Sequence, residues 1–170
     1  MANFNEYNLK DKVINAINNI GFKEPTKTQQ LVLPHALNGK NLACKGKTGS
    51  GKTHCFLIPI ANKIDENSKN LQALILVPTR ELALQINQRC KEFFKGYDIK
   101  ISCLTGGVDT LREKNRIQTT PQILIGTPEK ICDIAINSGL INLKYVNTFV
   151  VDEADMTLEM GFLNEVDRIA

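Results

Sequence analysis

The residues best suited to chemistry form a glycine-rich run at positions 46–53, Gly-Lys-Thr-Gly-Ser-Gly-Lys-Thr. This run fits the pattern Gly, four residues, Gly-Lys-Ser/Thr, whose backbone N–H groups wrap phosphates while the lysine and hydroxyl serve the outer phosphates and magnesium. The residues with these roles are Gly46, Thr48, Gly49, Ser50, Gly51, Lys52 and Thr53. The alternative is a flexible glycine turn. A second run, 148–155, is apolar and then acidic, and together the two runs predict an ATP site.

The two acids that follow the apolar residues 149–151 are suited to different steps of phosphate hydrolysis. Asp152, just past the strand end, can hold Mg²⁺ through its water shell, and Glu153 can orient and deprotonate the attacking water. Thr53 is the other candidate metal ligand. Acids after a strand also commonly cap the next helix, which is the alternative reading of this pair. The presence of the phosphate loop favours the catalytic interpretation.

Length and composition indicate one soluble domain. The chain has 170 residues, of which 42% are hydrophobic, enough for a core of its own. A net charge of +3 is compatible with a nucleic-acid partner. We expect no membrane partner, because no apolar stretch approaches ~18 residues and residues 1–6 lack the layout of a signal peptide. We therefore expect a cytoplasmic protein.

The cysteines do not suggest a disulfide framework or a zinc site. There are five, an odd number, and none forms a Cys-x-x-Cys pair. We expect them to be small buried residues in a reducing compartment. They are Cys44, Cys55, Cys90, Cys103 and Cys132.

Hydrophobic periodicity predicts alternating strands and helices, and hence an α/β fold with a parallel sheet covered on both faces. The expected strands are 41–44, 72–77, 100–104, 122–125 and 148–151. The expected helices are 13–20, 52–65, 80–95, 108–116 and 128–137. Gly21 should end the first helix, and Pro59 should kink or break the second early.

The unusual residues of the chain each begin where an expected strand ends. These segments are 46–53, 78–81, 105–107, 126–130 and 152–155. Because the carboxyl ends of parallel strands share one edge, we expect the five segments to converge there, on a surface large enough for a nucleotide and a further ligand.

With these motifs in order, the chain resembles the first RecA-like domain, a P-loop NTPase fold, of a DEAD-box RNA helicase. Residues 152–155 spell Asp-Glu-Ala-Asp, and residues 21–29 resemble the family's glutamine motif, with Phe4 as its upstream aromatic. Residues 78–83 match motif Ia, and residues 105–107 match the double-glycine turn. The segment 53–59 is similar to bacterial, cold-shock-type members.

The resemblance implies ATP and Mg²⁺ as cofactors. The amide of Gln29 has the donor and the acceptor needed to read an adenine edge, and Phe4 could stack on the base. Phe22 and Lys27, in the same motif, would join the nucleotide site, and Asp155 would couple the motif to the second domain. Alternatively, Gln29 is a surface residue of a helix begun at 25–26, and Phe4 is a core residue.

The resemblance also implies sequence-independent binding of the RNA sugar-phosphate backbone. The implied contacts are Pro78, Thr79, Arg80, Gly106, Gly107, Thr127 and Pro128. Alternatively, residues 106–107 are a plain turn and residues 127–128 a helix cap followed by proline. One departure weakens the phosphate contact, because Glu129 and Lys130 stand where the family has Gly-Arg. A second, Gly46 in place of alanine, is less serious.

The chain ends at Ala170, before the family's Ser-Ala-Thr motif and its strand would come. We therefore expect a truncated domain with an incomplete sheet. The second RecA-like domain, a partner in the parent protein, supplies arginines that stabilise transferred phosphate, so the fragment should hydrolyse almost no ATP. The alternatives are a P-loop ATPase that remodels DNA or protein complexes, or a non-catalytic nucleic-acid-binding module.

Overall fold

The computed structural model describes residues 2–47, 49–106 and 110–170, which form two compact units. The first unit is Met1–Ile64 with Cys90–Tyr97, and the second is Asp65–Arg89 with Asp98–Ala170. Helix α4 (Arg80–Phe93) begins in the second unit and ends in the first.

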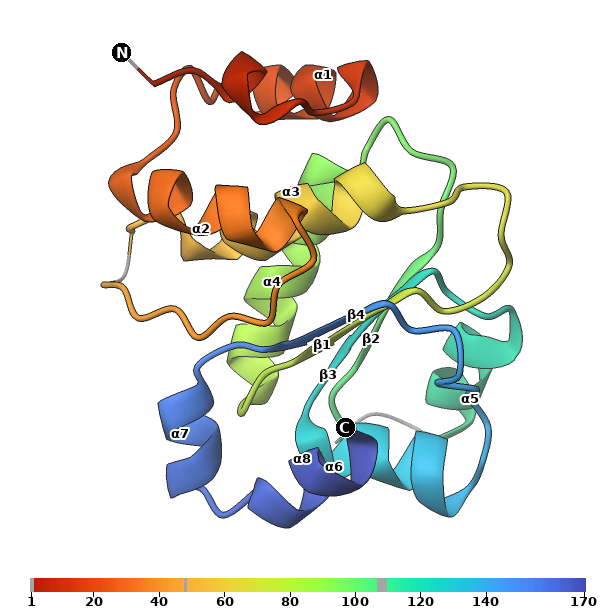
Figure 1. Ribbon diagram of the computed structural model, residues 1–170. Helices are drawn as coiled ribbons and strands as arrows, with labels where there is room; N and C mark the ends of the chain where they lie inside the picture. The colour runs from red at the N-terminus through yellow and green to blue at the C-terminus, as the bar shows by residue number, and fades with distance from the viewer. Residues whose placement is uncertain (1, 48, 107–109) are drawn as a thin grey trace. The chain divides into compact units, whose positions relative to one another are not determined.

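The first unit is helical. It contains the short 3₁₀ helix η1 (Phe4–Tyr7), α1 (Asp11–Asn19), α2 (Lys27–Leu37) and α3 (Lys52–Lys63). Helices α2 and α3 pack side by side (Figure 1). Helix α1 ends as predicted, because Gly21 takes the left-handed conformation at φ 85° that follows many helix ends.

The second unit contains a four-stranded sheet. Its strands are β1 (Ala73–Leu76), β2 (Ile101–Leu104), β3 (Ile123–Gly126) and β4 (Thr148–Val151). Its helical segments after α4 are α5 (Thr110–Gln118), α6 (Pro128–Ile131), the π-helical η2 (Cys132–Asn137), α7 (Ala154–Glu159) and α8 (Leu163–Ile169). The helix predicted over 128–137 thus forms as α6 continued by η2.

The strands lie in the order β2-β3-β1-β4, and every neighbouring pair is parallel (Figure 1). Leu76 at the end of β1 is in register with Gly126 on one side and Val151 on the other. Gly126 is also in register with Leu104. The predicted α/β fold with a parallel sheet is confirmed, and the strand ends align at one carboxyl edge.

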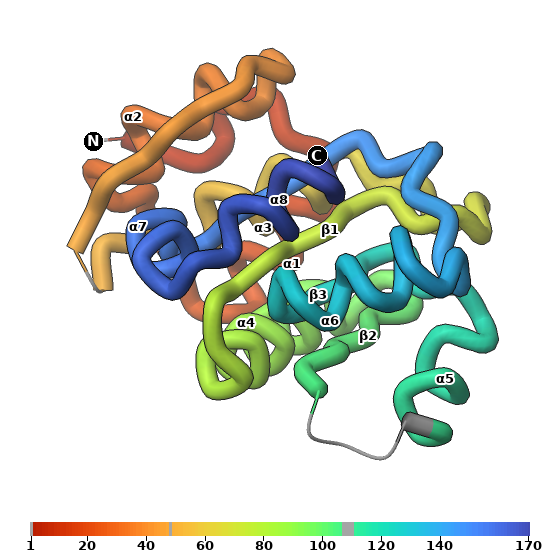
Figure 2. The backbone as a smooth tube through the Cα atoms, turned by 90° about the horizontal axis from the view of Figure 1, so that it is seen from below, coloured from red at the N-terminus to blue at the C-terminus, as the bar shows by residue number. Residues whose placement is uncertain are grey.

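One face of this sheet builds the core of the second unit. Leu74, Leu76 and Leu124 are fully buried there against Ile117 of α5 and Ile131 of α6. Helix α8 covers the same core with partly buried apolar residues. Seen from below, α6 and α8 lie in front of the strands (Figure 2). Each fully buried leucine contributes about 2 kcal/mol through loss of contact with water, so this layer holds the strand ends in place.

The strand expected at 41–44 is not formed, and that prediction is wrong. Residues 41–45 are exposed and without regular structure. A strand needs a neighbour for its backbone hydrogen bonds, and the four-stranded sheet contains no partner for this segment. Strand β4, expected to be buried on both faces, has only β1 as a neighbour in the described sheet, and Phe149 remains 38% exposed.

Of the kink or early break predicted at Pro59 in α3, the early break does not occur, since the helix runs on to Lys63. Leu57, Ile58 and Ile60 flank the proline and are buried. Their packing outweighs the one backbone hydrogen bond that proline removes.

Four of the five cysteines are buried as expected, and Cys44 differs because it lies in the exposed segment before the glycine loop. Burial raises the pKa of Cys55 to about 12, and the neighbouring Cys44 adds to the rise. Burial also raises the pKa of Cys90 to about 12.

In the described part of the chain, no helix has the length and apolarity needed to span a bilayer.

Candidate functional site

The glycine loop lies in the first unit, directly before α3. Gly49 and Gly51 both have φ 82°, in the left-handed region that favours glycine, and Gly51 is the N-cap of α3. The loop turns back on itself through a hydrogen bond from Ser50 N–H to the Lys47 carbonyl at 3.1 Å. Two left-handed glycines before a helix N-terminus turn successive N–H groups toward one point, which is the geometry that binds phosphate.

Polar side chains of the loop fit the same ligand. Among the described residues, Ser50 Oγ is buried without a hydrogen-bond partner. A Cβ added at Gly46 would lie 2.8 Å from that oxygen, so the loop is closely folded at this point. Lys52 is half-buried and Thr53 is 8% exposed at the start of α3. An unsatisfied buried hydroxyl beside a lysine is suited to an anionic ligand with several oxygens. Thr48 lies outside the described residues.

The glutamine motif is hydrogen-bonded to this loop. Thr26 caps α2 by accepting from Gln29 N–H, and Gln29 Oε1 accepts from Thr26 N–H at 3.0 Å, which completes a capping box. Gln29 Nε2 donates to the carbonyl of Gly51 at 3.2 Å, and Thr26 Oγ1 donates to the carbonyl of Ser50 at 2.8 Å. Gln29 is fully buried. Its bonds to Gly51 and Thr26 use one of its two amide donors and one of its two acceptor sites, so a donor and an acceptor remain for an adenine edge.

The aromatic candidates of the nucleotide site lie elsewhere in the first unit. Phe4 in η1 is 4% exposed, the burial expected of a core residue. Phe22 is half-buried and packs edge-on against His54, with ring centroids 4.7 Å apart. Lys27, the first residue of α2, is exposed. The structure thus joins Gln29 to the loop and places Phe4 in the core.

The acidic motif lies in the second unit at the carboxyl end of β4. Asp152 is half-buried, and its N–H donates to the Leu76 carbonyl at 2.9 Å, which fixes it to the end of β1. Glu153 has a left-handed backbone, φ 53°, that is costly for a residue with a side chain. Glu153 occupies the N-cap position of α7, yet its side chain makes no capping bond and is exposed, as is that of Asp155. The Glu153 carboxylate therefore does not cap α7, which was the alternative reading of the acidic pair.

The motif Ia residues follow β1. Pro78 is buried, and Thr79 Oγ1 accepts from Leu82 N–H at 3.2 Å, so Thr79 caps α4. Arg80 is the first residue of α4 and is exposed. A capped helix start with an exposed arginine offers both N–H groups and positive charge to a phosphate.

Two other candidate RNA segments meet in a groove of about 560 Å³ in the second unit. Thr105 and Gly106 follow β2, Thr127 and Lys130 follow β3, and all four line the groove. Pro128 is buried at the first position of α6, and Thr127 makes no side-chain cap bond. The parallel register of β2 with β3 brings these segments together. Gly107 lies outside the described residues.

Sequence reasoning missed Glu113, which lies beneath this groove. It is 1% exposed on α5, its Oε1 accepts from Gly106 N–H at 3.0 Å, and its Oε2 forms an ion pair with Lys130. The available signal was its spacing of one helical turn from the buried Ile117, which places Glu113 on the inward face of α5.

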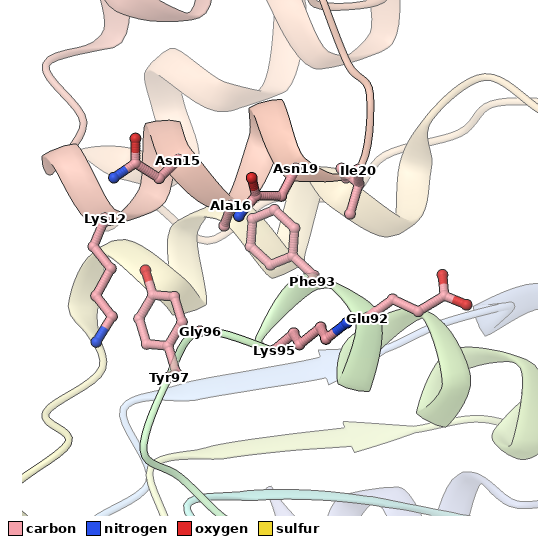
Figure 3. Close-up of a pocket in the computed structure, with 10 residues that line it drawn as sticks. All are labelled: Lys12, Asn15, Ala16, Asn19, Ile20, Glu92, Phe93, Lys95, Gly96 and Tyr97. Carbon is pink, nitrogen blue, oxygen red and sulfur yellow. The ribbon is translucent and has the colours of Figure 1, made fainter.

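A further hollow of about 810 Å³ lies in the first unit between α1 and the end of α4 (Figure 3). Lys12 reaches beside the Tyr97 ring, with its Nζ 4.7 Å from the ring centroid. None of the described residues that were predicted for the nucleotide or RNA sites lines this hollow. Among the described residues, no group of three or more acidic, histidine or cysteine side chains is placed to hold a metal ion.

Comparisons with known proteins agree with these motifs. Residues 26–170 match the family model described as DEAD/DEAH box helicase. The chain is 39% identical over 169 residues to the ATP-dependent RNA helicase CshA of Listeria monocytogenes, covering 99% of the chain and 32% of the relative. It is 42% identical over 168 residues to a probable ATP-dependent RNA helicase of Methanocaldococcus jannaschii, covering 98% of the chain and 45% of the relative.

The same likeness is seen among solved structures. The crystal structure of a DEAD box protein from Methanococcus jannaschii superimposes with a TM-score of 0.91 at 41% identity, over 99% of the chain and 46% of that structure. A hypothetical ATP-dependent RNA helicase from Sulfolobus tokodaii superimposes with a TM-score of 0.85 at 32% identity, over 95% of the chain and 46% of that structure. The chain therefore spans less than half the length of these similar proteins.

Proposed function

Because the chain belongs to the DEAD/DEAH box helicase family, we propose that it is the ATP-binding first domain of an ATP-dependent RNA helicase. The observation that carries this proposal is the glycine loop at the start of α3, with Gly51 bonded to the buried Gln29. A phosphate cradle joined to a residue able to read adenine forms one nucleotide site.

In this proposal the loop binds the phosphates of ATP. The N–H groups around Gly49 and Gly51, the ammonium of Lys52 and the hydroxyl of Ser50 hold the phosphate oxygens. Thr53 of the loop and Asp152 of the acidic motif are each proposed as ligands of Mg²⁺, with water completing the coordination. Bound Mg²⁺ neutralises phosphate charge.

Glu153 is the proposed general base for ATP hydrolysis. Its exposed carboxylate makes no capping bond, so it is available to orient a water molecule and accept its proton. The strained left-handed backbone of Glu153 supports a functional role, since such strain is concentrated at active sites.

The proposed RNA surface is the carboxyl edge of the sheet. Thr79 and Arg80 after β1, Gly106 after β2 and Thr127 after β3 stand at adjacent strand ends. Backbone N–H groups and a lone arginine contact phosphates without reading bases, which makes the binding independent of sequence. A second RecA-like domain, coupled through Asp155, would complete the ATP site and the RNA surface. The two proposed substrates, ATP and RNA, are consistent with a cytoplasmic protein.

The test is ATP hydrolysis by the full-length protein with no nucleic acid, with single-stranded RNA and with single-stranded DNA of the same length. We expect stimulation by RNA, and loss of turnover in Lys52→Ala and Glu153→Gln. The isolated 170 residues should turn over almost no ATP, because the family's arginines on the second domain are missing. Equal stimulation by DNA, or full activity of Lys52→Ala, would contradict the proposal.

A further inference from the structure

Glu113 is held in one place by α5 and its anchors on β2. Ser102 Oγ donates to the Arg116 carbonyl at 3.1 Å, and an Arg116 guanidinium N–H donates to the Cys103 carbonyl at 3.1 Å. These bonds fix α5 one helical turn from Glu113. The carboxylate is buried as a result, and it contacts the end of β2 through Gly106 and the start of α6 through Lys130.

The two groups that hold this carboxylate are phosphate-binding groups. A backbone N–H in a glycine turn and a lysine ammonium are typical contacts for an RNA phosphate. Gly106 N–H is bonded to Glu113 Oε1, and the Lys130 side chain, 19% exposed, is paired with Glu113 Oε2. The Gly106 N–H and the Lys130 ammonium therefore form an anion site, which the Glu113 carboxylate already fills.

The other charged residues of the groove do not make up for the Gly106 and Lys130 contacts that Glu113 occupies. Glu129, Asp133 and Glu165 line it with negative charge. Its second cation, Arg168, donates to Asn137 Oδ1 at 2.8 Å. Within the described lining of the groove, Lys130 is thus ion-paired and Arg168 is hydrogen-bonded to a neutral amide, while the three acids repel a phosphate.

We propose that Glu113 is an internal competitor of RNA phosphate, which occupies the Gly106 and Lys130 anion site and lowers the RNA affinity of this groove. This inference rests on the proposed RNA-binding function of the carboxyl edge. Glu113 thereby sets the RNA affinity of the groove indirectly, through Lys130. A phosphate can bind there only when the Glu113 carboxylate releases Gly106 and Lys130.

The test measures binding of a fluorescein-labelled ten-residue oligouridylate by fluorescence anisotropy. The KCl concentration is varied over about one decade, from 25 to 200 mM, so that the slope of log K against log salt can be determined. We expect Glu113→Gln to free Lys130, to steepen the slope of log K against log salt by about 0.7, and to tighten binding about five-fold at 0.1 M salt. Lys130→Gln in the otherwise unchanged chain should leave the slope as it is. The double variant should return to the wild-type slope.

The matched control is Asp167→Asn, which makes the same change in net charge on an exposed position that does not line the groove. We expect no change of slope in this variant. The inference is overturned if Lys130→Gln alone lowers the slope, because Lys130 would then contact RNA despite Glu113. It is also overturned if Glu113→Gln behaves like Asp167→Asn. Thermal unfolding of each variant excludes a loss of fold.

A second measurement needs no RNA and separates this inference from the proposed function. The amide resonance of Gly106 is followed by nitrogen-15 NMR during titration with inorganic phosphate. In Glu113→Ala the emptied site should take up phosphate and shift the resonance, while the wild type shows no shift. An unshifted resonance in folded Glu113→Ala overturns the inference. Failure of every variant to bind RNA, with the phosphate shift present, overturns the proposed function instead.

Discussion

The buried side-chain amide of Gln29 donates a hydrogen bond to the backbone carbonyl of Gly51 at 3.2 Å. Gly51 has a left-handed backbone, and a Cβ on it would lie 2.6 Å from Gln29 Nε2 and 2.9 Å from Thr26 Oγ1. The left-handed backbone and the close approach of Gln29 both require glycine at this position. The start of α2 and the phosphate loop therefore act as one structural element.

The first prediction concerns Gly51→Ala. The substitution adds backbone strain of about 1–2 kcal/mol and a clash with Gln29, so we expect a larger loss of unfolding free energy than strain alone would give. Gly49→Ala is the matched control, because it has the same φ of 82° and open space around its Cβ. Urea unfolding measures both, and equal losses would show that the contact with Gln29 is unimportant.

The second prediction concerns Gln29→Ala, which removes the capping-box acceptor and the bond to Gly51. We expect the unfolding free energy to fall by about 1–3 kcal/mol, because partners of a buried amide lose their hydrogen bonds. The neighbouring Gln30, whose exposed side chain donates to the Pro25 carbonyl at 2.9 Å, is the control. Gln30→Ala should change stability by no more than about 0.5 kcal/mol. Similar effects of the two substitutions in urea unfolding would refute the coupling.

The third prediction separates stability from activity at Glu153. Glu153→Gly should raise the unfolding free energy by up to about 1 kcal/mol, because relief of the left-handed strain exceeds the added entropy of the unfolded chain. Glu153→Gln keeps the strain and should leave stability within about 0.5 kcal/mol of wild type. Both should abolish ATP turnover of the full-length protein. A destabilised Glu153→Gly would show that the backbone there is not strained.

The fourth prediction concerns thiol reactivity. At pH 8 a maleimide should label exposed Cys44 first, while Cys55 and Cys90 resist, because burial raises each pKa from 9.0 to about 12 and the reactive thiolate is scarce. Mass spectrometry after timed quenching locates the label, and Cys44→Ser is the control. Labelling of Cys90 at the rate of Cys44 in the folded chain would contradict the prediction.

The same two pKa shifts set a dependence of stability on pH. Below pH 9 both thiols are protonated in the folded and unfolded chain, so their contribution is fully present. As pH rises from 9 toward 12, the unfolded chain ionises while the folded chain keeps its protons, so the unfolding free energy falls. In urea titrations between pH 9 and 12, the unfolding free energy of Cys90→Ala should fall less than that of the wild type. An equal fall in both proteins would show that Cys90 does not contribute to the pH dependence.

Structural features that are set by residues close together in the sequence were predicted well. The four parallel strands and the helices beginning at Lys52 and Arg80 follow from apolar runs and capping signals. The placement of Gly106 and Thr127 in one groove follows from the alignment of parallel strand ends. The strand at 41–44 failed because a strand depends on a partner distant in sequence, which periodicity does not reveal.

The amino-acid sequence by itself determined the family, the glycine loop, the acidic motif and the α/β alternation, because each is written in residue types at short, fixed spacing. Only the tertiary structure decided that Gln29 is bonded to Gly51, that Phe4 is buried, and that Glu113 occupies the anion site of Gly106 and Lys130. These relationships join residues far apart along the chain. They depend on how the helices pack against the loop and the sheet, and no local pattern records that packing.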